Sequence, residues 1–182
     1  INPKKIYCGE DYKFGLNASG NAEYLKQYFD VEIIKLLKMK QKKISTADII
    51  SYIQKGELVS ANELLNRPYR LTGTVVKGLG NGKKIGFPTA NLDLDFDYYL
   101  PKEGVYIGYA FIDDVKYKAI ISVGTHPTIQ TLSKPIIEVH VLNFEGNLYG
   151  KFIDVAFIKR IRNIITFESL EHLAKQLEKD KE

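Results

Sequence analysis

The sequence contains little cysteine and no long apolar run. Its 182 residues include one cysteine, Cys8, which excludes an internal disulfide framework and a cysteine-based zinc site and makes a reducing compartment the default expectation. No uninterrupted apolar stretch approaches the roughly 18 residues of a membrane-spanning helix, and the first residues lack a signal-peptide pattern. We therefore expect a soluble, cytoplasmic protein. Because residue 1 is isoleucine, the sequence is consistent with part of a longer polypeptide.

Charge of one sign is not in large excess either. The chain has 26 Lys and Arg against 22 Asp and Glu, a net charge of +4, and lysines and glutamates alternate instead of forming a basic block. This balance weakly favours an anionic ligand and does not require nucleic acid. We expect small-molecule substrates, no nucleic-acid or membrane partner, and a monomer.

The first part of the chain has the mixed periodicity of an α/β segment. Residues 31–37 are apolar and β-branched, which predicts a buried parallel strand, and a helix is expected to end at Gly56. Residues 66–69, Asn-Arg-Pro-Tyr, break the pattern, because proline disfavours helix at the preceding residue. We place a domain boundary there, between 1–66 and 67–182.

From residue 70 onward the hydrophobic period changes to two. Five or more strands without intervening helices predict a closed or nearly closed antiparallel barrel. Helical spacing returns at Leu170, Leu173, Ala174 and Leu177, so one amphipathic helix is expected against the barrel. The strand-like runs are 70–76, 105–112, 115–123, 136–142 and 152–158.

A glycine-rich stretch at 73–91 is the strongest indication of function. Glycines let backbone N–H groups approach an anion without a Cβ in the way, and Lys83 and Lys84 add mobile positive charge, so the loop suits a polyphosphate. It is not a Walker loop, because it has no Gly-Lys-Ser/Thr ending, and its Gly-Phe-Pro-Thr sequence does not open a helix as a dinucleotide fingerprint does. The glycines concerned are Gly78, Gly80, Gly82 and Gly86.

Motifs in the second part of the chain resemble those of the riboflavin kinase family. They are Gly-Phe-Pro-Thr-Ala-Asn-Leu at 86–92, Leu-Pro-Lys-Glu-Gly-Val-Tyr at 100–106, Val-Gly-Thr-His-Pro-Thr at 123–128 and Ile-Glu-Val-His-Val-Leu at 137–142. Asn-Leu-Tyr-Gly at 147–150, Arg162 and Phe167 follow in the family's order. The resemblance implies a six-stranded antiparallel Greek-key β-barrel with a C-terminal helix, and ATP-dependent phosphorylation of riboflavin to FMN.

The resemblance also implies a set of site residues. Glu138 corresponds to the catalytic base, and Thr89 and Asn91 to the ligands of Mg²⁺. Arg162 and Phe167 correspond to a flap over the flavin. The positions implied for ATP are Gly78, Gly80, Gly82, Lys83, Gly86, Pro88, Thr89, Asn91, Asn143 and Tyr149. The sequence departs from the family pattern at Asn143, where aspartate is common, and at Ile164, where an acidic residue is frequent.

The residues themselves permit this chemistry but do not require it. Thr89 and Asn91 are two apart, so in an extended segment their side-chain oxygens share one face and suit a partly hydrated Mg²⁺, although a Pro-Thr-Ala-Asn segment also forms ordinary turns. Glu138 and His140 alternate with apolar neighbours, so Glu138 is either a base held on a rigid strand or part of a solvated polar face. His140 is expected to be a hydrogen-bonded neighbour, not a base or metal ligand.

The first part resembles a different enzyme domain. Gly-Glu-Asp-Tyr-Lys-Phe-Gly at 9–15 is similar to a signature of the FMN adenylyltransferase half of bifunctional bacterial FAD synthetases, a Rossmann-like nucleotidyltransferase domain. The histidine-containing nucleotide-binding turn of that half does not precede this signature. Ala47 and Ile50 stand where the family's Ile-Ser-Ser-Thr-x-Ile-Arg motif has a hydroxyl residue and arginine. Both features argue against adenylyl transfer by this chain, and 1–66 is interpreted as a partial domain.

Three alternatives to a flavokinase remain open from sequence. The chain can belong to a complete bifunctional riboflavin kinase/FAD synthetase. It can be a non-catalytic flavin-binding module, in which the departures at Asn143 and Ile164 have abolished turnover. A third alternative is a barrel that binds single-stranded nucleic acid through its 12 tyrosines and 9 phenylalanines, although these aromatics are dispersed and many alternate with apolar residues as core positions do.

Overall fold

The computed structural model describes residues 3–39, 41–78, 88–124, 136–165 and 170–181. The chain forms two compact units, Ile1–Ser45 and Thr46–Glu182. The predicted boundary at residue 66 falls inside the second unit, because the two helices before it pack on the sheet that follows.

The first unit contains a two-stranded parallel sheet. Strand β1 (Ile6–Gly9) pairs with β4 (Val31–Ile34), and the short helix α1 (Ala22–Leu25) lies between them in the chain. The unit also has a 3-10 turn, η1 (Leu16–Ala18), and two minimal hairpins, β2 (Lys13–Phe14) with β3 (Gly20–Asn21) and β5 (Lys38–Met39) with β6 (Lys42–Lys43). The parallel strand predicted at 31–37 is confirmed over 31–34 only. The predicted burial is wrong, because Ile34 is 46% exposed.

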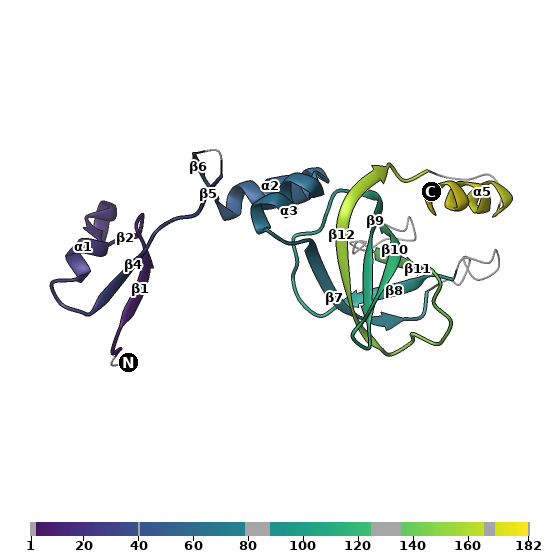
Figure 1. Ribbon diagram of the computed structural model, residues 1–182, viewed down its shortest axis with the longest axis horizontal. Helices are drawn as coiled ribbons and strands as arrows, with labels where there is room; N and C mark the ends of the chain where they lie inside the picture. The colour runs from purple at the N-terminus through teal and green to yellow at the C-terminus, as the bar shows by residue number, and fades with distance from the viewer. Residues whose placement is uncertain (1–2, 40, 79–87, 125–135, 166–169, 182) are drawn as a thin grey trace. The chain divides into compact units, whose positions relative to one another are not determined.

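The second unit is built on a closed barrel of six antiparallel strands, shown in Figure 1. Around the barrel the order is β10 (Val115–Gly124), β11 (Ile136–Val141), β8 (Ala90–Leu94), β7 (Tyr69–Val76), β12 (Phe152–Arg162) and β9 (Gly104–Ile112). Strand β8 pairs with β7 and β11, and not with β9, which follows it in the chain. The predicted barrel is therefore confirmed, including the sixth strand that the family resemblance implied.

Strand β8 is the one that hydrophobic periodicity did not predict. Its five residues, Ala-Asn-Leu-Asp-Leu, do alternate between apolar and polar types, but the run is short and begins two residues after Pro88, at the end of the glycine-rich stretch. It is nevertheless central, because its residues pair with neighbours on both sides, and Asn91 is registered with Val76 on β7 and with Glu138 on β11.

Within the described part of the chain, helices α2, α3 and α5 accompany the barrel. Helix α2 (Thr46–Lys55) ends at Gly56, whose φ of 78° suits glycine, and α3 (Leu58–Leu65) follows at once. Their buried residues Ile53, Leu58 and Ala61 join the barrel core. The C-terminal helix α5 (Leu170–Lys181) confirms the helical spacing of the tail. Among the described residues, none of the helices is both long and apolar enough to cross a membrane.

Candidate active site

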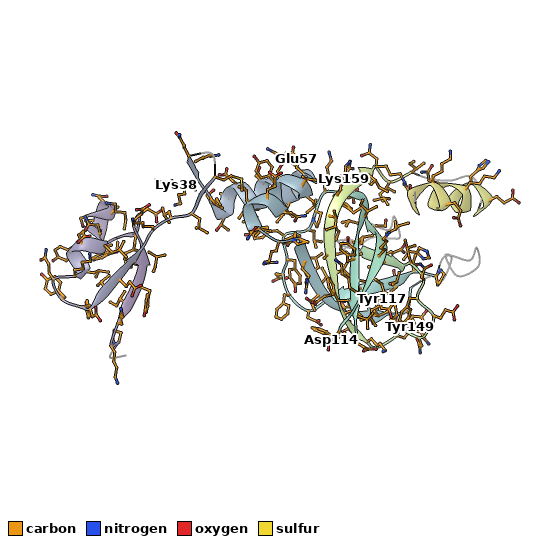
Figure 2. The ribbon with its side chains drawn as sticks, viewed as in Figure 1. Lys38, Glu57, Asp114, Tyr117, Tyr149 and Lys159 are labelled. Atoms are coloured by element: carbon orange, nitrogen blue, oxygen red, sulfur yellow. The ribbon has the colours of Figure 1, made fainter. Side chains whose placement is uncertain are left out.

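A cavity of about 420 Å³ opens at one end of the barrel. Its walls come from β7, the start of β8, the end of β11 and the loop that follows β11, and they are mainly apolar. Figure 2 shows Tyr149 on this loop at the same end of the barrel as Tyr117. The lining residues are Val75, Pro88, Thr89, Ala90, Val139, Val141, Phe144, Gly146, Asn147, Leu148 and Tyr149.

The loop of residues 143–150 is held by a small number of local contacts. Asn143 has a φ of 56° and turns the chain out of β11, so it shapes the loop without lining the cavity. The Tyr149 backbone N–H donates to the Asn147 Oδ1 at 3.0 Å, and the Gly150 N–H donates to the Val75 carbonyl at 2.8 Å. The Phe144 ring meets the edge of Tyr117 at 5.3 Å. These contacts fix the wall that carries Tyr149, whose ring is half exposed.

Gly78 and Asn91 are in close contact. The Asn91 side chain is 8% exposed, and a Cβ added at Gly78 would lie 2.0 Å from its Nδ2. Since real Cβ atoms do not approach that closely, any other residue at Gly78 would displace either the loop or the asparagine. The structure thus brings the first glycine of the predicted phosphate loop against a predicted metal ligand.

Glu138 lies next to Asn91 in the sheet. The two residues are paired in the register of β11 and β8, and cross-strand partners project to the same face with Cβ atoms about 5 Å apart. The same row continues through Ser122 on β10 and Val105 on β9 to Arg162 on β12. Three strand spacings, roughly 15 Å measured along the curved sheet, lead from Glu138 to Arg162, which is halfway around the six-stranded barrel.

His140 occupies the same face of β11 as Glu138, two residues along. Its side chain is 8% exposed, and its Nδ1 lies 2.9 Å from the Pro88 carbonyl oxygen. Because a carbonyl only accepts hydrogen bonds, Nδ1 carries the proton. The expectation that His140 is a hydrogen-bonded neighbour is confirmed.

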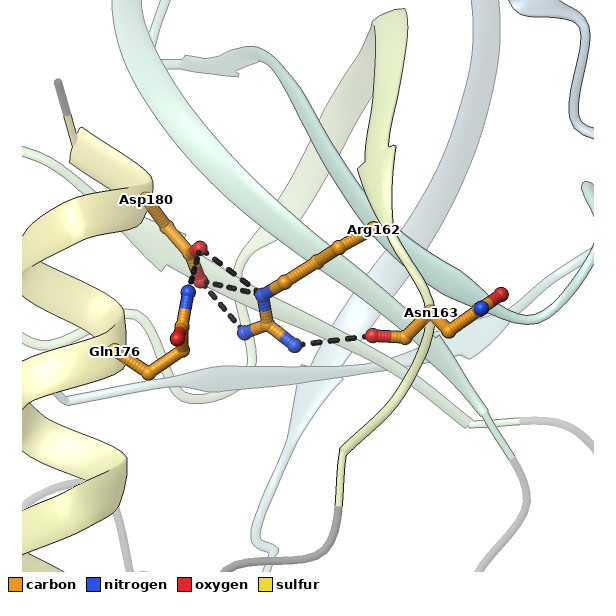
Figure 3. Close-up of polar contacts among 4 residues, drawn as sticks. All are labelled: Arg162, Asn163, Gln176 and Asp180. Atoms are coloured by element: carbon orange, nitrogen blue, oxygen red, sulfur yellow. Dashed lines mark hydrogen bonds and ion pairs between the residues drawn. The ribbon is translucent and has the colours of Figure 1, made fainter.

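Arg162 is bound by the C-terminal helix, as Figure 3 shows. Its Nε donates to the Asp180 Oδ1 at 3.0 Å and its Nη2 to the Asp180 Oδ2 at 2.6 Å, and the Gln176 amide donates to the same carboxylate at 3.0 Å. The Arg162 and Asp180 side chains are 16% and 4% exposed. The side chain predicted to face the flavin is therefore occupied by a buried ion pair in this structure.

The remaining predicted site residues lie outside the described ranges. These are Gly80, Gly82, Lys83, Gly86 and Phe167. Sequence reasoning in turn missed the cavity walls at Val75, Phe144 and Leu148, and it missed Asp180. Part of the cavity wall could have been found from sequence, since the alternation of β11 places Val139 and Val141 on one face. Nothing in the sequence distinguishes Asp180 from the other acidic residues of α5.

Comparison with known proteins identifies the family. The riboflavin kinase (flavokinase) family model matches residues 65–182, and the chain belongs to this family. The chain is 33% identical to the bifunctional riboflavin kinase/FMN adenylyltransferase of Listeria monocytogenes over 186 residues, and 35% identical to that of Haemophilus influenzae over 188 residues. All of this chain is covered in both comparisons, but it spans only 59% and 60% of the length of those relatives.

A solved structure with the same fold is also similar in sequence. It is a protein from Streptococcus pneumoniae described as a macrolide-efflux protein, with a TM-score of 0.85 and 36% identity. The match covers 95% of this chain and 57% of the other. The similarity therefore extends through both compact units and not only through the barrel.

Proposed function

We propose that the chain transfers the γ-phosphoryl group of ATP to the 5′-hydroxyl of riboflavin, forming FMN and ADP. The observation that carries the proposal is the pairing of Glu138 with Asn91 on one face of the sheet, two residues after Thr89, which borders a cavity lined from the other face. Phosphoryl transfer depends mainly on holding donor and acceptor in line, so a base next to a phosphate-binding segment is the arrangement it requires. Membership of the riboflavin kinase family supports the choice of acceptor.

The cavity is the proposed site of the nucleotide base. Its apolar walls, with Tyr149 and Phe144 among them, suit a flat heterocycle. From there the phosphates would pass Pro88 and Thr89 toward the start of the glycine-rich loop at Gly78. Gly80, Gly82, Lys83 and Gly86 are proposed to continue this contact, and Asn143 to shape the wall from behind.

Thr89 and Asn91 are the proposed protein ligands of Mg²⁺. Both offer neutral oxygens, and the described residues contain no cluster of three or more His, Cys, Asp or Glu side chains that could hold a metal ion. This donor set fits Mg²⁺, which keeps several waters and binds substrate phosphates instead of an all-protein cage. When bound, the ion would neutralise phosphate charge.

Glu138 is the proposed general base. Its carboxylate accepts the proton of the riboflavin hydroxyl while the hydroxyl oxygen forms its bond to the γ-phosphorus, and the bond from that phosphorus to the ADP oxygen breaks. Arg162 and Phe167 are proposed to contact the ring end of the flavin. Contact between Arg162 and a flavin would require the guanidinium either to leave the Asp180 carboxylate or to bind the carboxylate and the flavin at the same time.

The test is product formation by the purified chain and by one substitution. Incubation with riboflavin, ATP and Mg²⁺, followed by chromatography of the flavins, is expected to show FMN. Glu138→Gln should reduce kcat by about 10²-fold, because the amide cannot accept the proton. Glu63→Gln, an exposed glutamate on α3, is the matched control. Riboflavin binding without FMN would instead indicate a non-catalytic flavin module, and unchanged turnover in Glu138→Gln would reject the base.

The same chromatogram tests adenylylation of FMN to FAD. The observation in its favour is the parallel β1–β4 pair of the first unit, the strand arrangement of α/β nucleotide-binding sheets. The curated relatives are named as bifunctional enzymes, of which this chain spans about 60%. FAD appearing after FMN would support this second activity, and FMN alone would limit the chain to the kinase reaction.

A further inference from the structure

The chain leaves the barrel at the segment that borders the cavity. Strand β8 is paired with β11 through three positions, the last of which joins Ala90 to Val139. Beyond Ala90 the ladder stops, and Pro88 has no N–H with which to continue it. Thr89 therefore sits on a segment that the sheet itself no longer holds in register.

Where the backbone ladder ends, the side chain of His140 makes the next contact between β11 and the segment before β8. His140 would be the next residue of β11 in register, and its Nδ1–H donates to the Pro88 carbonyl at 2.9 Å. His140 as a residue is 8% exposed, so water competes little for this bond. Because the imidazole is planar and buried, the bond restrains both the position and the orientation of the peptide between Pro88 and Thr89.

We propose that His140 is a positioning residue for the nucleotide site. It acts through the Pro88 carbonyl, one peptide bond before Thr89, and sets where the Thr89 hydroxyl meets the phosphates and their metal ion. His140 itself transfers no proton and does not contact the substrate. The inference rests on the proposed function for the role of Thr89, while the hydrogen bond and its place at the end of β8 stand on the structure alone.

The chemistry of the donor allows a sharp comparison of variants. An asparagine amide nitrogen is attached at Cγ, close to the place of Nδ1 in histidine, whereas a glutamine amide nitrogen lies one carbon further out, nearer the place of Nε2. His140→Asn should therefore keep the bond to Pro88 and His140→Gln should lose it. Asn62→Leu is the matched control, because Asn62 also bonds backbone groups, Tyr69 N–H at 2.7 Å and the Phe157 carbonyl at 2.8 Å, away from the residues that line the cavity.

The experiment measures kcat, the KM for MgATP, the KM for riboflavin and thermal stability in each variant. His140→Gln is expected to raise the KM for MgATP by about tenfold or more, as loss of an outer-shell partner does, with the KM for riboflavin unchanged. His140→Asn is expected to stay within about threefold of the wild type, since it retains the donor. Asn62→Leu should lower the melting temperature without raising the KM for MgATP.

A double substitution tests whether the effect passes through Thr89. Adding His140→Gln to Thr89→Ala should cost little more than Thr89→Ala alone, because residues that act as a unit are not additive. Additive losses, equal losses in His140→Asn and His140→Gln, or a matching rise of KM in Asn62→Leu would each overturn the inference.

Binding of MgADP, measured by calorimetry on the same proteins, separates this inference from the proposed function. A wild-type chain that binds MgADP with the same dependence on residue 140 but forms no FMN would reject the kinase and keep the positioning role. A wild-type chain that forms FMN, with MgADP binding that does not depend on residue 140, would keep the kinase and reject the positioning role. If it neither forms FMN nor binds MgADP, both are rejected.

Discussion

Single residues around Asn91 decide how closely the chain after β7 packs against β8. Gly78 has no room for a side chain, since a Cβ would lie 2.0 Å from the Asn91 amide nitrogen. Asn91 is itself fixed between Val76 and Glu138 by its place in β8. Small changes at this point should therefore affect the nucleotide site before they affect the barrel.

Gly78→Ala is expected to raise the KM for MgATP by about tenfold, because the added methyl group must displace Asn91 or the loop. Steady-state kinetics at varied MgATP measure this. Gly73→Ala, in the preceding strand β7, provides the control, since its Cβ would lie 2.4 Å from the Asp93 carbonyl oxygen. The control should lower the melting temperature and leave the KM for MgATP unchanged, and the opposite pattern would contradict the assignment of Gly78.

Tyr69 should make the barrel sensitive to high pH. Burial raises the pKa of Tyr69 to about 12, and its hydroxyl donates to the Tyr99 carbonyl at 2.8 Å. In the unfolded chain a tyrosine has a pKa near 10. The stabilisation is therefore complete below about pH 10, and it is lost as the pH rises toward about 12, because the unfolded state ionises first.

Urea unfolding at pH 8, 10 and 11 measures this effect. Tyr69→Phe should be less stable by about 1 kcal/mol at pH 8, through the lost hydrogen bond, but should lose less stability than the wild type between pH 10 and 11. Tyr99→Phe is the control, because it keeps the backbone acceptor. Identical pH dependence in the wild type and Tyr69→Phe would show that this hydroxyl does not set the alkaline limit.

At the scale of elements, the C-terminal helix is attached to the barrel by a buried ion pair. Arg162 ends β12, and Asp180 lies in the last turn of α5. The sequence spacing that predicted α5 identified its apolar positions but not this polar contact. Removing one partner of a buried pair leaves the other uncompensated, so the two elements should depend on each other.

Asp180→Ala is expected to loosen α5 from β12. Amide hydrogen exchange over 170–181 should become at least about tenfold faster, because the ion pair and its Gln176 contact are lost together. Lys179→Ala, an exposed position of the same helix, is the control and should leave the exchange rates unchanged. Equal exchange in Asp180→Ala and the wild type would mean that α5 is held by other contacts.

At the scale of the whole molecule, the barrel unit begins before the family match does. The family model starts at residue 65, but the compact unit starts at Thr46. Helices α2 and α3 supply Ile53, Leu58 and Ala61 to the barrel core, all at most 2% exposed. They are therefore part of the barrel's stability and not only a connection to the first unit.

Two fragments test this boundary. Residues 46–182 should fold and form FMN at a rate within about twofold of the full chain, because a unit with its own core folds by itself. Residues 67–182 should be less stable by several kcal/mol, about the cost of deleting buried aliphatic side chains from a core. Thermal unfolding and FMN formation of both fragments measure the difference, and equal stability would place the boundary at residue 66, as the sequence predicted.

The sequence by itself determined the local features of this protein. Period-two alternation predicted five of the six barrel strands, Gly56 marked the end of α2, and the motifs at 86–92 and 137–142 identified the family. Each of these signals is carried by neighbouring residues, and neighbouring residues fix backbone conformation and which side chains share a face.

Only the tertiary structure decided which strands are neighbours and in what register. Glu138 and Asn91 are 47 positions apart, and their pairing depends on closure of the barrel around β8, the shortest of its six strands. The same holds for His140 with Pro88 and for Arg162 with Asp180. Such contacts form only when many segments pack together, so the pattern of neighbouring residues in the sequence does not predict them.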